Sequence, residues 1–278
     1  MTHDHDMSPL TRLVARLDRA ADGEADFDLI ATNFPSLDKA LGGGVRRGDL
    51  LVLGGDDSAG CSALALGIAL RLHHRALFLT SEMHPDRVYE RALANTARVS
   101  LENIRMGTIS DDERIRLATA AVSMRDQAPV VETFTGGGLP RIEAAIGATP
   151  AARLVVIDTL EGVLHRDHGH DEALSYAVVA LKRLALLKNI AVLLTTHLPG
   201  LDRSRADRRP RLTDFGIGGA VGAQADLVLA LYREELYDFD HGVSGGAELL
   251  ILKNRDGARG YVDLFFETRY GRFEDVAQ

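Results

Sequence analysis

Short apolar runs and helix-like segments alternate along this sequence from residue 50 onward. The apolar runs lie at residues 50–55, 76–80, 129–132, 153–158, 190–196 and 226–232. The segments with apolar residues at helical spacing lie at 62–74, 85–98, 112–125, 139–148 and 171–188. Continuous apolar strands separated by helices are typical of a mostly parallel sheet with helices on both faces. The alternation therefore predicts an α/β fold with such a sheet at its centre.

The pattern changes after residue 245, where the sequence reads AELLILKNRDGARGYVDLFFE. Two strand-like runs there flank the turn residues 254–257, Asn-Arg-Asp-Gly. Polar residues and glycine between two apolar runs are a hairpin signal. We therefore expect a C-terminal β-hairpin in addition to the parallel strands.

The first 29 residues differ from the remainder of the chain. Ser8 followed by Pro9 is typical of a helix start, and the helix is expected to end near Asp22-Gly23. Periodicity reveals an apolar helix face but not its partner, so packing on its own domain and docking on another body both remain open. We predict an N-terminal tail and amphipathic linker helix over 1–29 and one domain over 30–278. The apolar face consists of Leu10, Leu13, Val14 and Leu17.

Charge and cysteine content exclude several classes of protein. The formal net charge is −8, so any contact with nucleic acid must come from a local basic patch. The single cysteine, Cys61, has no partner for an internal disulfide, and the N-terminus lacks the basic and apolar regions of a secretory signal. No apolar run approaches the roughly 20 residues that cross a bilayer. We expect a cytoplasmic protein without membrane contact.

Residues 53–64, LGGDDSAGCSAL, connect the first apolar run to the first helical segment. A glycine-rich loop in this position presents backbone N–H groups and a helix N-terminus to phosphate. A strand–loop–helix connection can also serve packing alone, so the loop by itself leaves both interpretations open. Against the pattern G-x-x-x-x-G-K-[ST], the residues expected to contact a nucleotide are Gly55, Ser58, Gly60, Cys61 and Ser62.

Two features of this loop oppose phosphate binding. Cys61 stands where the pattern has lysine, which removes the cation that contacts the β- and γ-phosphates. Asp56 and Asp57 add two negative charges beside the place that a polyanion would occupy. Losing such a cation commonly lowers the rate by a factor of roughly a thousand or more, so we expect slow hydrolysis. Arg46 and Arg47, in the turn before the first strand, are the candidates to supply the missing charge.

Two carboxylates follow other strands of the predicted sheet. Asp158 ends the run RLVVID, where it would hold Mg²⁺ through water. Glu82 follows the run ALFLT, where it would orient and deprotonate an attacking water. An exposed glutamate in such a place is also typical of a helix cap or a solvated residue. The order of the motifs supports a joint site, because open α/β sheets bind ligands at the carboxyl ends of their strands.

Several motifs follow one another along the chain. They are FPSLDKALGGGVRRGDLLVLGG before the loop, FLTSEM, LVVIDTLEG, RADRRPRLTDF with QADLVLALYREELY, and AELLILKNRDGARGYVDLFFETRYGRFED. Together they resemble the C-terminal motor domain of the DnaB-type replicative DNA helicases, a RecA-like P-loop NTPase fold. The resemblance covers roughly residues 30–275 and implies a hexameric ring that binds ATP and Mg²⁺ between subunits and pulls single-stranded DNA through its channel.

The resemblance also implies roles for individual residues. Ser62 and Asp158 would serve Mg²⁺, and Glu82 would be the catalytic base. Lys253 and Arg255 match a basic pair that reaches the neighbouring subunit's site, and two cations at alternate strand positions do share a face. A hairpin edge that is guarded by charge is the alternative interpretation. The N-terminal helix matches a linker helix that packs on the next subunit.

The chain also departs from the family pattern. His197 stands at the sensor position, where the family has a glutamine, and Asp56 stands where it has a basic residue. In the family's DNA-facing loop a basic and an acidic residue are replaced here by Gly216-Ile217-Gly218-Gly219, after Asp214-Phe215. The chain has no room for the family's N-terminal domain, through which family members usually meet primase. We therefore expect a bare motor ring.

The segment DRSRADRRPR supplies a local basic patch in this acidic chain. Lining a ring, its arginines would contact DNA phosphates with strong salt dependence and little sequence preference. A solvated surface loop is the alternative interpretation. The predicted DNA-binding residues are Arg203, Arg205, Arg208, Arg209 and Arg211.

A second polar cluster, HRDHGHDE, lies after the strand that ends at Asp158. Alternating histidines and acids are suitable metal ligands, but the spacing matches no closed zinc motif, and free loop histidines are the alternative. The residues concerned are His165, Asp167, His168, His170, Asp171 and Glu172.

Three functions remain open from the sequence. The first is an ATP-driven helicase or translocase of the DnaB type, in which another cation replaces the lysine. The second is a pseudo-ATPase that binds nucleotide or DNA as a regulatory or assembly subunit beside an intact replicative helicase or its loader. The third is a structural oligomer that uses the fold for assembly alone.

Overall fold

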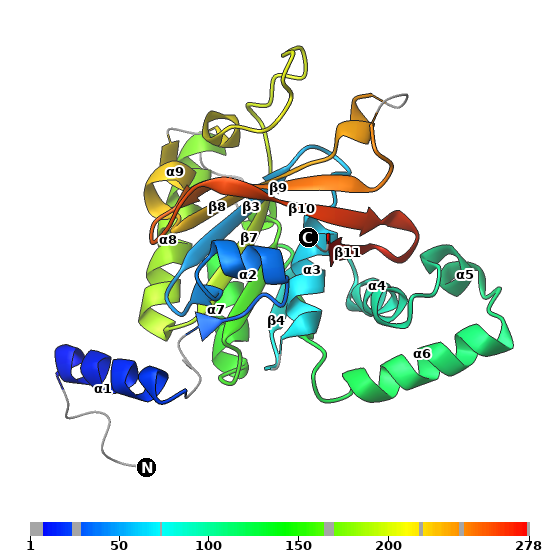
Figure 1. Cartoon of the computed structure of the whole chain (residues 1–278), viewed down its shortest axis with the longest axis horizontal. Helices are drawn as coiled ribbons and strands as arrows, with labels where there is room; N and C mark the ends of the chain where they lie inside the picture. Colours follow the sequence, from blue (N-terminus) through cyan, green and yellow to red (C-terminus); the bar gives the residue numbers. More distant parts are fainter. Residues whose placement is uncertain are drawn as a thin grey trace.

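The computed structural model describes residues 8–23, 29–72, 74–163, 170–216, 219–238 and 242–276. Within them lies a nine-stranded sheet with the order β11-β10-β9-β8-β3-β7-β6-β4-β5 (Figure 1). The strands from β8 to β5 run parallel, and β9, β10 and β11 extend the sheet antiparallel. The predicted α/β fold with a mostly parallel sheet is confirmed.

Each parallel strand coincides with a predicted apolar run to within one residue at either end. β9 and β10 form the predicted hairpin, whereas β11 was not expected. The parallel strands are β3 (Leu50–Gly55), β4 (Leu77–Thr80), β5 (Val130–Thr133), β6 (Leu154–Asp158), β7 (Ala191–His197) and β8 (Leu227–Tyr232). The antiparallel strands are β9 (Gly246–Asn254), β10 (Gly260–Glu267) and β11 (Arg272–Asp275), and a separate small pair is β1 (Leu29–Ile30) with β2 (Val45–Arg46).

Apolar side chains leave both faces of the sheet, because successive strand residues point in opposite directions. Leu51 of β3 packs in one core cluster with Leu64 of α3, whereas Leu50 packs in a second cluster with Leu181 of α8. No helix within the described ranges is long and apolar enough to cross a bilayer. The helices after residue 30 are α2 (Pro35–Ala40), α3 (Cys61–Arg71), α4 (Pro85–Ala97), α5 (Leu101–Met106), α6 (Asp111–Met124), α7 (Gly138–Ala148), α8 (His170–Lys188) and α9 (Ala220–Gln224).

The predicted N-terminal helix is present as α1 (Pro9–Ala21), and it lies apart from the sheet in Figure 1. Its apolar face is exposed to solvent, so this face is not buried against the described residues of its own domain. The four residues of that face are Leu10, Leu13, Val14 and Leu17, with exposures of 69%, 41%, 49% and 56%.

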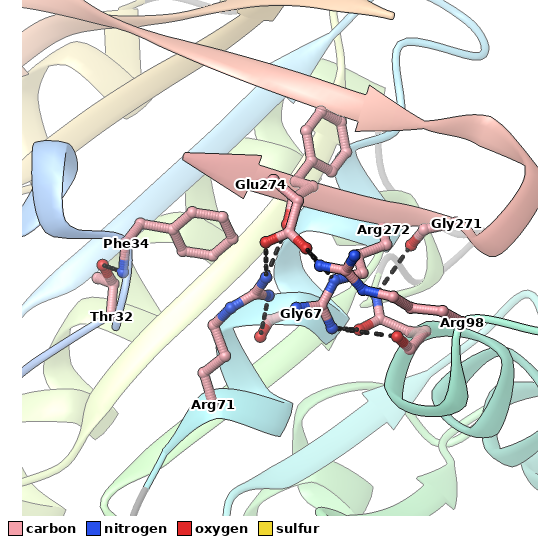
Figure 2. A network of polar contacts seen from close by, with 10 residues as sticks. Thr32, Phe34, Gly67, Arg71, Arg98, Gly271, Arg272 and Glu274 are labelled. Atoms are coloured by element: carbon pink, nitrogen blue, oxygen red, sulfur yellow. Dashed lines mark hydrogen bonds and ion pairs between the residues drawn. The ribbon is translucent and has the colours of Figure 1, made fainter. Parts of the chain in front are cut away.

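The last strand is tied to two helices by a cluster of arginines around one carboxylate (Figure 2). Glu274 of β11 accepts from Arg98 and Arg272 at 2.5 Å each and from Arg71 of α3 at 3.3 Å. Arg71 also donates to the Phe273 carbonyl at 2.7 Å. Burial opposes ionisation of Glu274, but the hydrogen bond and charge of Arg272 outweigh it, and the pKa of this carboxyl is lowered.

Replacing Glu274 with alanine is expected to destabilise the fold by about 2 kcal/mol, because three arginines then face one another without their carboxylate. Urea unfolding measures this effect. Since the pKa of Glu274 lies below its ordinary value of 4.5, the carboxylate stabilises the fold above that value, and the contribution disappears as the pH falls through the lowered pKa. Asp112→Ala, which removes the exposed partner of Arg116, should cost less than about 0.5 kcal/mol. An equal loss in both variants would contradict this account.

Candidate active site

The glycine loop lies between β3 and α3. At two of its positions the backbone is too tightly folded for any residue other than glycine. Gly60 has φ +105°, and a Cβ there would lie 3.0 Å from the ring of Phe273. A Cβ on Gly55 would lie 2.7 Å from the Cys61 sulfur. Ser58, also at positive φ, accepts a hydrogen bond on its carbonyl from Arg233 at 3.1 Å. The loop is therefore a preformed cradle and not a loose connection.

Cys61 occupies the first position of α3 as a neutral thiol. Burial and the neighbouring charge of Asp158 raise the pKa of this thiol to about 12. The residue therefore supplies neither the positive charge of a lysine nor a thiolate for metal binding or nucleophilic attack.

Ser62 and Asp158 meet below the loop, as the sequence predicts. The Ser62 hydroxyl donates to Asp158 Oδ1 at 2.8 Å, and Thr195 of β7 donates to the same oxygen at 2.7 Å. Asp158 is fully buried, which raises its pKa, and its Oδ2 has no hydrogen-bond partner. A buried carboxylate oxygen without a partner is costly unless a cation or water meets it, and oxygen ligands suit Mg²⁺. The residues present thus fit the expected metal ion.

Glu161 is a carboxylate that sequence reasoning missed. Its Oε1 accepts from the Thr196 hydroxyl at 2.8 Å and from the His197 backbone N–H at 3.0 Å, while its Oε2 is buried without a partner. The residue lies in a 3₁₀ turn just after β6, and no local pattern distinguishes it from a surface glutamate. It adds negative charge beneath the same site.

Glu82 and His197 face each other across the loop. His197 Nε2 lies 3.9 Å from Glu82 Oε1, and Nδ1 lies 3.5 Å from Asp57 Oδ1. Burial, with the charge of Asp158, raises the pKa of Glu82 against the opposing effect of His197. A carboxylate of raised pKa beside a phosphate cradle is suited to accept a proton from water.

A cleft of about 390 Å³ opens above these residues. Its walls come from the glycine loop, α4, the end of β7 and the turn between β10 and β11, where Thr268 and Gly271 lie. Among the described residues that line it, Arg91 of α4 is the single arginine or lysine, and its charge acts on Asp158. Sequence reasoning missed Arg91 because nothing in a helical segment indicates which of its arginines faces a cleft.

The two loop aspartates do not both face the cleft as bare charges. Arg203 donates from Nε to Asp56 Oδ2 at 3.0 Å, with a second bond from its Nη2, and the Tyr237 hydroxyl adds a bond of 2.8 Å. Although burial opposes ionisation, the Arg203 contact prevails and the pKa of Asp56 is lowered. Asp57 remains exposed, with Arg203 Nη2 and His197 Nδ1 each 3.5 Å from one of its oxygens. Arg203 therefore offsets the charge of Asp56, and about one negative charge of the glycine loop is left to repel a polyanion.

The predicted DNA-binding arginines contact groups of their own chain. Arg205 forms an ion pair with Asp214 at 2.5 Å, and Arg209 forms one with Glu248 at 2.5 Å. Arg208 donates to the Arg203 and Tyr237 carbonyls. Arg211 lies exposed after them. The segment is a structured loop rather than a merely solvated one.

Lys253 and Arg255 lie at the far edge of the sheet from their own glycine loop. Lys253 pairs with Val228 near the start of β8, whereas Gly55 aligns with Leu231 near its end. Lys253 donates to carbonyls that include that of Gly222, at 2.8 Å, and Arg255 forms an ion pair with Asp226 at 2.9 Å. Within one chain this pair cannot reach the cleft.

The expectation that Arg46 and Arg47 supply the missing charge is wrong for their own chain. Both precede the first residue of β3, while the glycine loop begins at its last residue, and a strand of six residues spans roughly 20 Å. Arg46 lies 3.7 Å from Asp256, and Arg47 donates to the Asn189 carbonyl at 2.7 Å. Both side chains face the opposite edge of the sheet.

Two predicted segments fall partly outside the described residues. Of the 165–172 cluster, only Glu172 has a described side chain, and the described residues elsewhere contain no group of three or more potential metal-binding His, Cys, Asp or Glu side chains. Residues 217–218 of the predicted DNA-facing loop also lie outside the described residues. Asp214, just before that loop, is buried and accepts hydrogen bonds from the Arg205 side chain and from the Arg211 backbone N–H.

The description "DnaB-like helicase C terminal domain" belongs to a family model that matches residues 30–275. The chain is a member of this family. The resemblance seen in the motifs is thereby confirmed, and the matched range contains the cleft, the arginine loop (residues 199–211) and the C-terminal hairpin.

Curated relatives agree with this DnaB-like assignment, and solved structures share the fold. The chain is 26% identical to "Replicative DNA helicase DnaB" of Leifsonia xyli, over 98% of this chain and 62% of that protein. It is 27% identical to the Pasteurella multocida protein of the same name, over 90% of this chain and 56% of that protein. It thus spans about six tenths of these relatives. A solved "ATPase Domain" superposes with a TM-score of 0.88 at 24% identity over 98% of this chain and all of that one. A second solved structure, described as that of "A DnaB-Like Replicative Helicase And Its Interactions With Primase", has a TM-score of 0.86 at 23% identity over all of this chain and 69% of that one. These two structures share the fold.

Proposed function

We propose that this DnaB-like chain binds ATP with Mg²⁺, assembles into a hexameric ring and translocates on single-stranded DNA as a helicase core, with hydrolysis slowed by the missing lysine. The observation that carries the proposal is the fully buried Asp158, held by Ser62 and Thr195, with one carboxylate oxygen left for a cation. A site that had decayed to packing would not keep an unpartnered buried carboxylate, because its burial is costly.

The residues around the cleft divide the chemical work. Gly55, Ser58 and Gly60 shape a cradle of backbone amides, and Ser62 with Asp158 holds Mg²⁺, which would neutralise charge on the phosphate oxygens. Glu82 accepts the proton of the attacking water. His197, between Glu82 and Asp57, senses whether the cleft is occupied.

Arg91 takes the part of the missing lysine in this proposal. It lines the cleft and its positive charge acts on the Asp158 side of the site. A guanidinium binds phosphate oxygens as well as an ammonium does, but from α4 it approaches them from the side and not from the loop itself. This difference is consistent with retained binding and slower transfer of the phosphoryl group.

Lys253 and Arg255 complete the site of a neighbouring copy. Their place at the opposite edge of the sheet supports action in trans, since a ring stacks one edge of each subunit against the cleft of the next. A cation supplied in this way stabilises charge during phosphoryl transfer. ATP would then be bound between subunits.

The exposed face of α1 and an apolar groove support assembly of the ring. The groove, a cavity of about 880 Å³ between α7 and α8, is lined in part by Val163, Tyr176, Ala180 and Leu187. Two of these side chains, Tyr176 and Leu187, are largely exposed. An apolar helix face without a partner and an apolar groove without an occupant suit each other across two copies.

Replacing both Leu13 and Leu17 with aspartate is expected to weaken assembly by roughly a hundredfold, because two buried leucines contribute about 3 kcal/mol. Light scattering over a concentration series measures the change in mass. Arg19→Asp, on the polar face of α1, is the matched control and should assemble like the native chain. Equal assembly of all three proteins would contradict the role of α1.

A second candidate function is favoured by Cys61 alone. A neutral thiol at the lysine position suits a pseudo-ATPase that binds nucleotide or DNA without turnover, beside an intact replicative helicase or its loader. A purely structural oligomer is a third, and it is disfavoured by the exposed Glu82 and the unpartnered Asp158 oxygen.

The test is ATP hydrolysis by the purified protein, with and without single-stranded DNA, at concentrations where the ring assembles. Hydrolysis that DNA stimulates is the expected result. If nucleotide binds without any turnover, the motor is excluded and the pseudo-ATPase remains. If nucleotide does not bind either, only assembly is left.

A further inference from the structure

Arg203 joins the glycine loop to the arginine loop, residues 199–211, through a close ion pair with Asp56 and a longer contact of 3.5 Å with Asp57. Asp56 of the glycine loop is held by Arg203 and by the Tyr237 hydroxyl, and its side chain is only 10% exposed. Arg203 is 60% exposed. The carboxylate is thus enclosed, while the guanidinium remains within reach of a ligand from solvent.

The surrounding contacts hold this pair in place. Arg208 donates from Nε to the Arg203 carbonyl at 3.1 Å and from Nη1 to the Tyr237 carbonyl at 3.2 Å. Its guanidinium also lies 5.4 Å from the centre of the Tyr237 ring. The arginine loop and the segment after β8 therefore approach the glycine loop as one unit.

The other ion pairs of the loop have a different character. Arg205 is mostly buried and its partner Asp214 is almost completely so, which makes this pair a buried support. Arg209 is 44% exposed and binds Glu248 on β9, away from the glycine loop. Of these three pairs, that of Arg203 combines the most exposed guanidinium with an acid of the glycine loop.

We propose that Asp56 competes with DNA phosphate for Arg203. Without DNA, Arg203 is paired with the glycine loop, and a phosphate of bound DNA takes the place of Asp56. A guanidinium that pairs with a phosphate in the same fork geometry cannot keep both bonds to Asp56. DNA binding therefore releases Asp56, and the change is transmitted to the nucleotide cleft. By linkage, a nucleotide at the glycine loop alters DNA affinity by the same factor. The inference rests on the proposed binding of DNA, but not on hydrolysis.

The test measures binding of a fluorescent oligothymidine by anisotropy over a series of salt concentrations, without nucleotide. In Asp56→Asn, Arg203 keeps only its 3.5 Å contact with the exposed Asp57 and becomes available for one phosphate contact. Affinity should then rise about fivefold at roughly 0.1 M salt, and the slope of log K against log salt should steepen by about 0.7. Asp207→Asn is the matched control, because it removes the same charge from the arginine loop while Arg209 keeps Glu248. It should change affinity by less than about twofold.

A second pair of variants separates competition from general charge and from misfolding. Adding Asp56→Asn to Arg203→Gln should produce no further change in DNA affinity, since the cation in question is absent. Thermal unfolding checks that each variant is folded. If Asp56→Asn alone is unstable, the comparison of Arg203→Gln with the double variant Arg203→Gln/Asp56→Asn provides the test.

Three outcomes would overturn the inference. They are an equal gain in Asp56→Asn and Asp207→Asn, a gain from Asp56→Asn that persists in the Arg203→Gln background, and no detectable DNA binding by either native chain or Asp56→Asn at low salt. The first two outcomes leave the proposed function untouched, whereas the third would also remove DNA from it. ATP hydrolysis without DNA is measured separately.

Discussion

Glu82→Gln is expected to lower ATP hydrolysis by a factor of about a hundred or more while nucleotide still binds. The glutamine keeps the shape of the side chain but cannot accept a proton from water, and general-base catalysis contributes roughly 10²–10⁴ in rate. Phosphate release measures the rate, and a fluorescent nucleotide measures the affinity. Because burial raises the pKa of Glu82, the native rate should fall as the pH drops through that raised pKa, and the variant should lose this dependence.

Glu90→Gln is the matched control for this prediction. Glu90 lies on α4 but does not line the cleft, so the same chemical change there should leave the rate within about twofold. A Glu82→Gln variant that hydrolyses ATP at the native rate would show that the carboxylate is the solvated residue of the alternative interpretation.

Cys61→Lys is expected to raise ATP hydrolysis by a factor of roughly a thousand, which is what a cation on the transferring phosphate commonly contributes. The native thiol is neutral, so the change adds one positive charge at the first residue of α3, beside the cradle and opposite Asp158. The measurement is the rate of phosphate release in the presence of single-stranded DNA.

Cys61→Met is the control that adds length without charge. Equal rates in Cys61→Lys and Cys61→Met would mean that the loop has lost more than its cation. If Arg91 does replace the lysine, Arg91→Gln should weaken nucleotide binding strongly in the native chain and less in the Cys61→Lys background, because the two cations then share one task.

Most of the central sheet follows from local patterns. Apolar runs such as 153–158 and 190–196 became β6 and β7 with ends displaced by no more than one residue, since a buried parallel strand needs apolar side chains on both faces. The strand order and the third antiparallel strand, β11, were not predictable from such patterns. β11 depends on Arg71 and Arg98, which meet Glu274 from 203 and 176 residues away.

The candidate site was partly predictable for a geometric reason. Ser62 and Glu82 follow parallel strands and Asp158 ends one, and the carboxyl ends of parallel strands lie at one edge of a sheet. Thr195, Glu161 and Arg91 belong to the same site, yet a threonine within a strand, a glutamate in a turn and an arginine on a helix carry no local signal of that role.

By itself the sequence determined the fold class, the glycine cradle and the identity of the charges around it, because strand periodicity and loop chemistry are local properties. Only the tertiary structure decided which charges meet. Arg203 neutralises Asp56 from 147 residues away, whereas Arg46 and Arg47, which are near the loop in sequence, lie at the other end of β3. The physical reason is that ion pairs depend on how elements pack, and a strand of six residues separates sequence neighbours by more than a side chain can span.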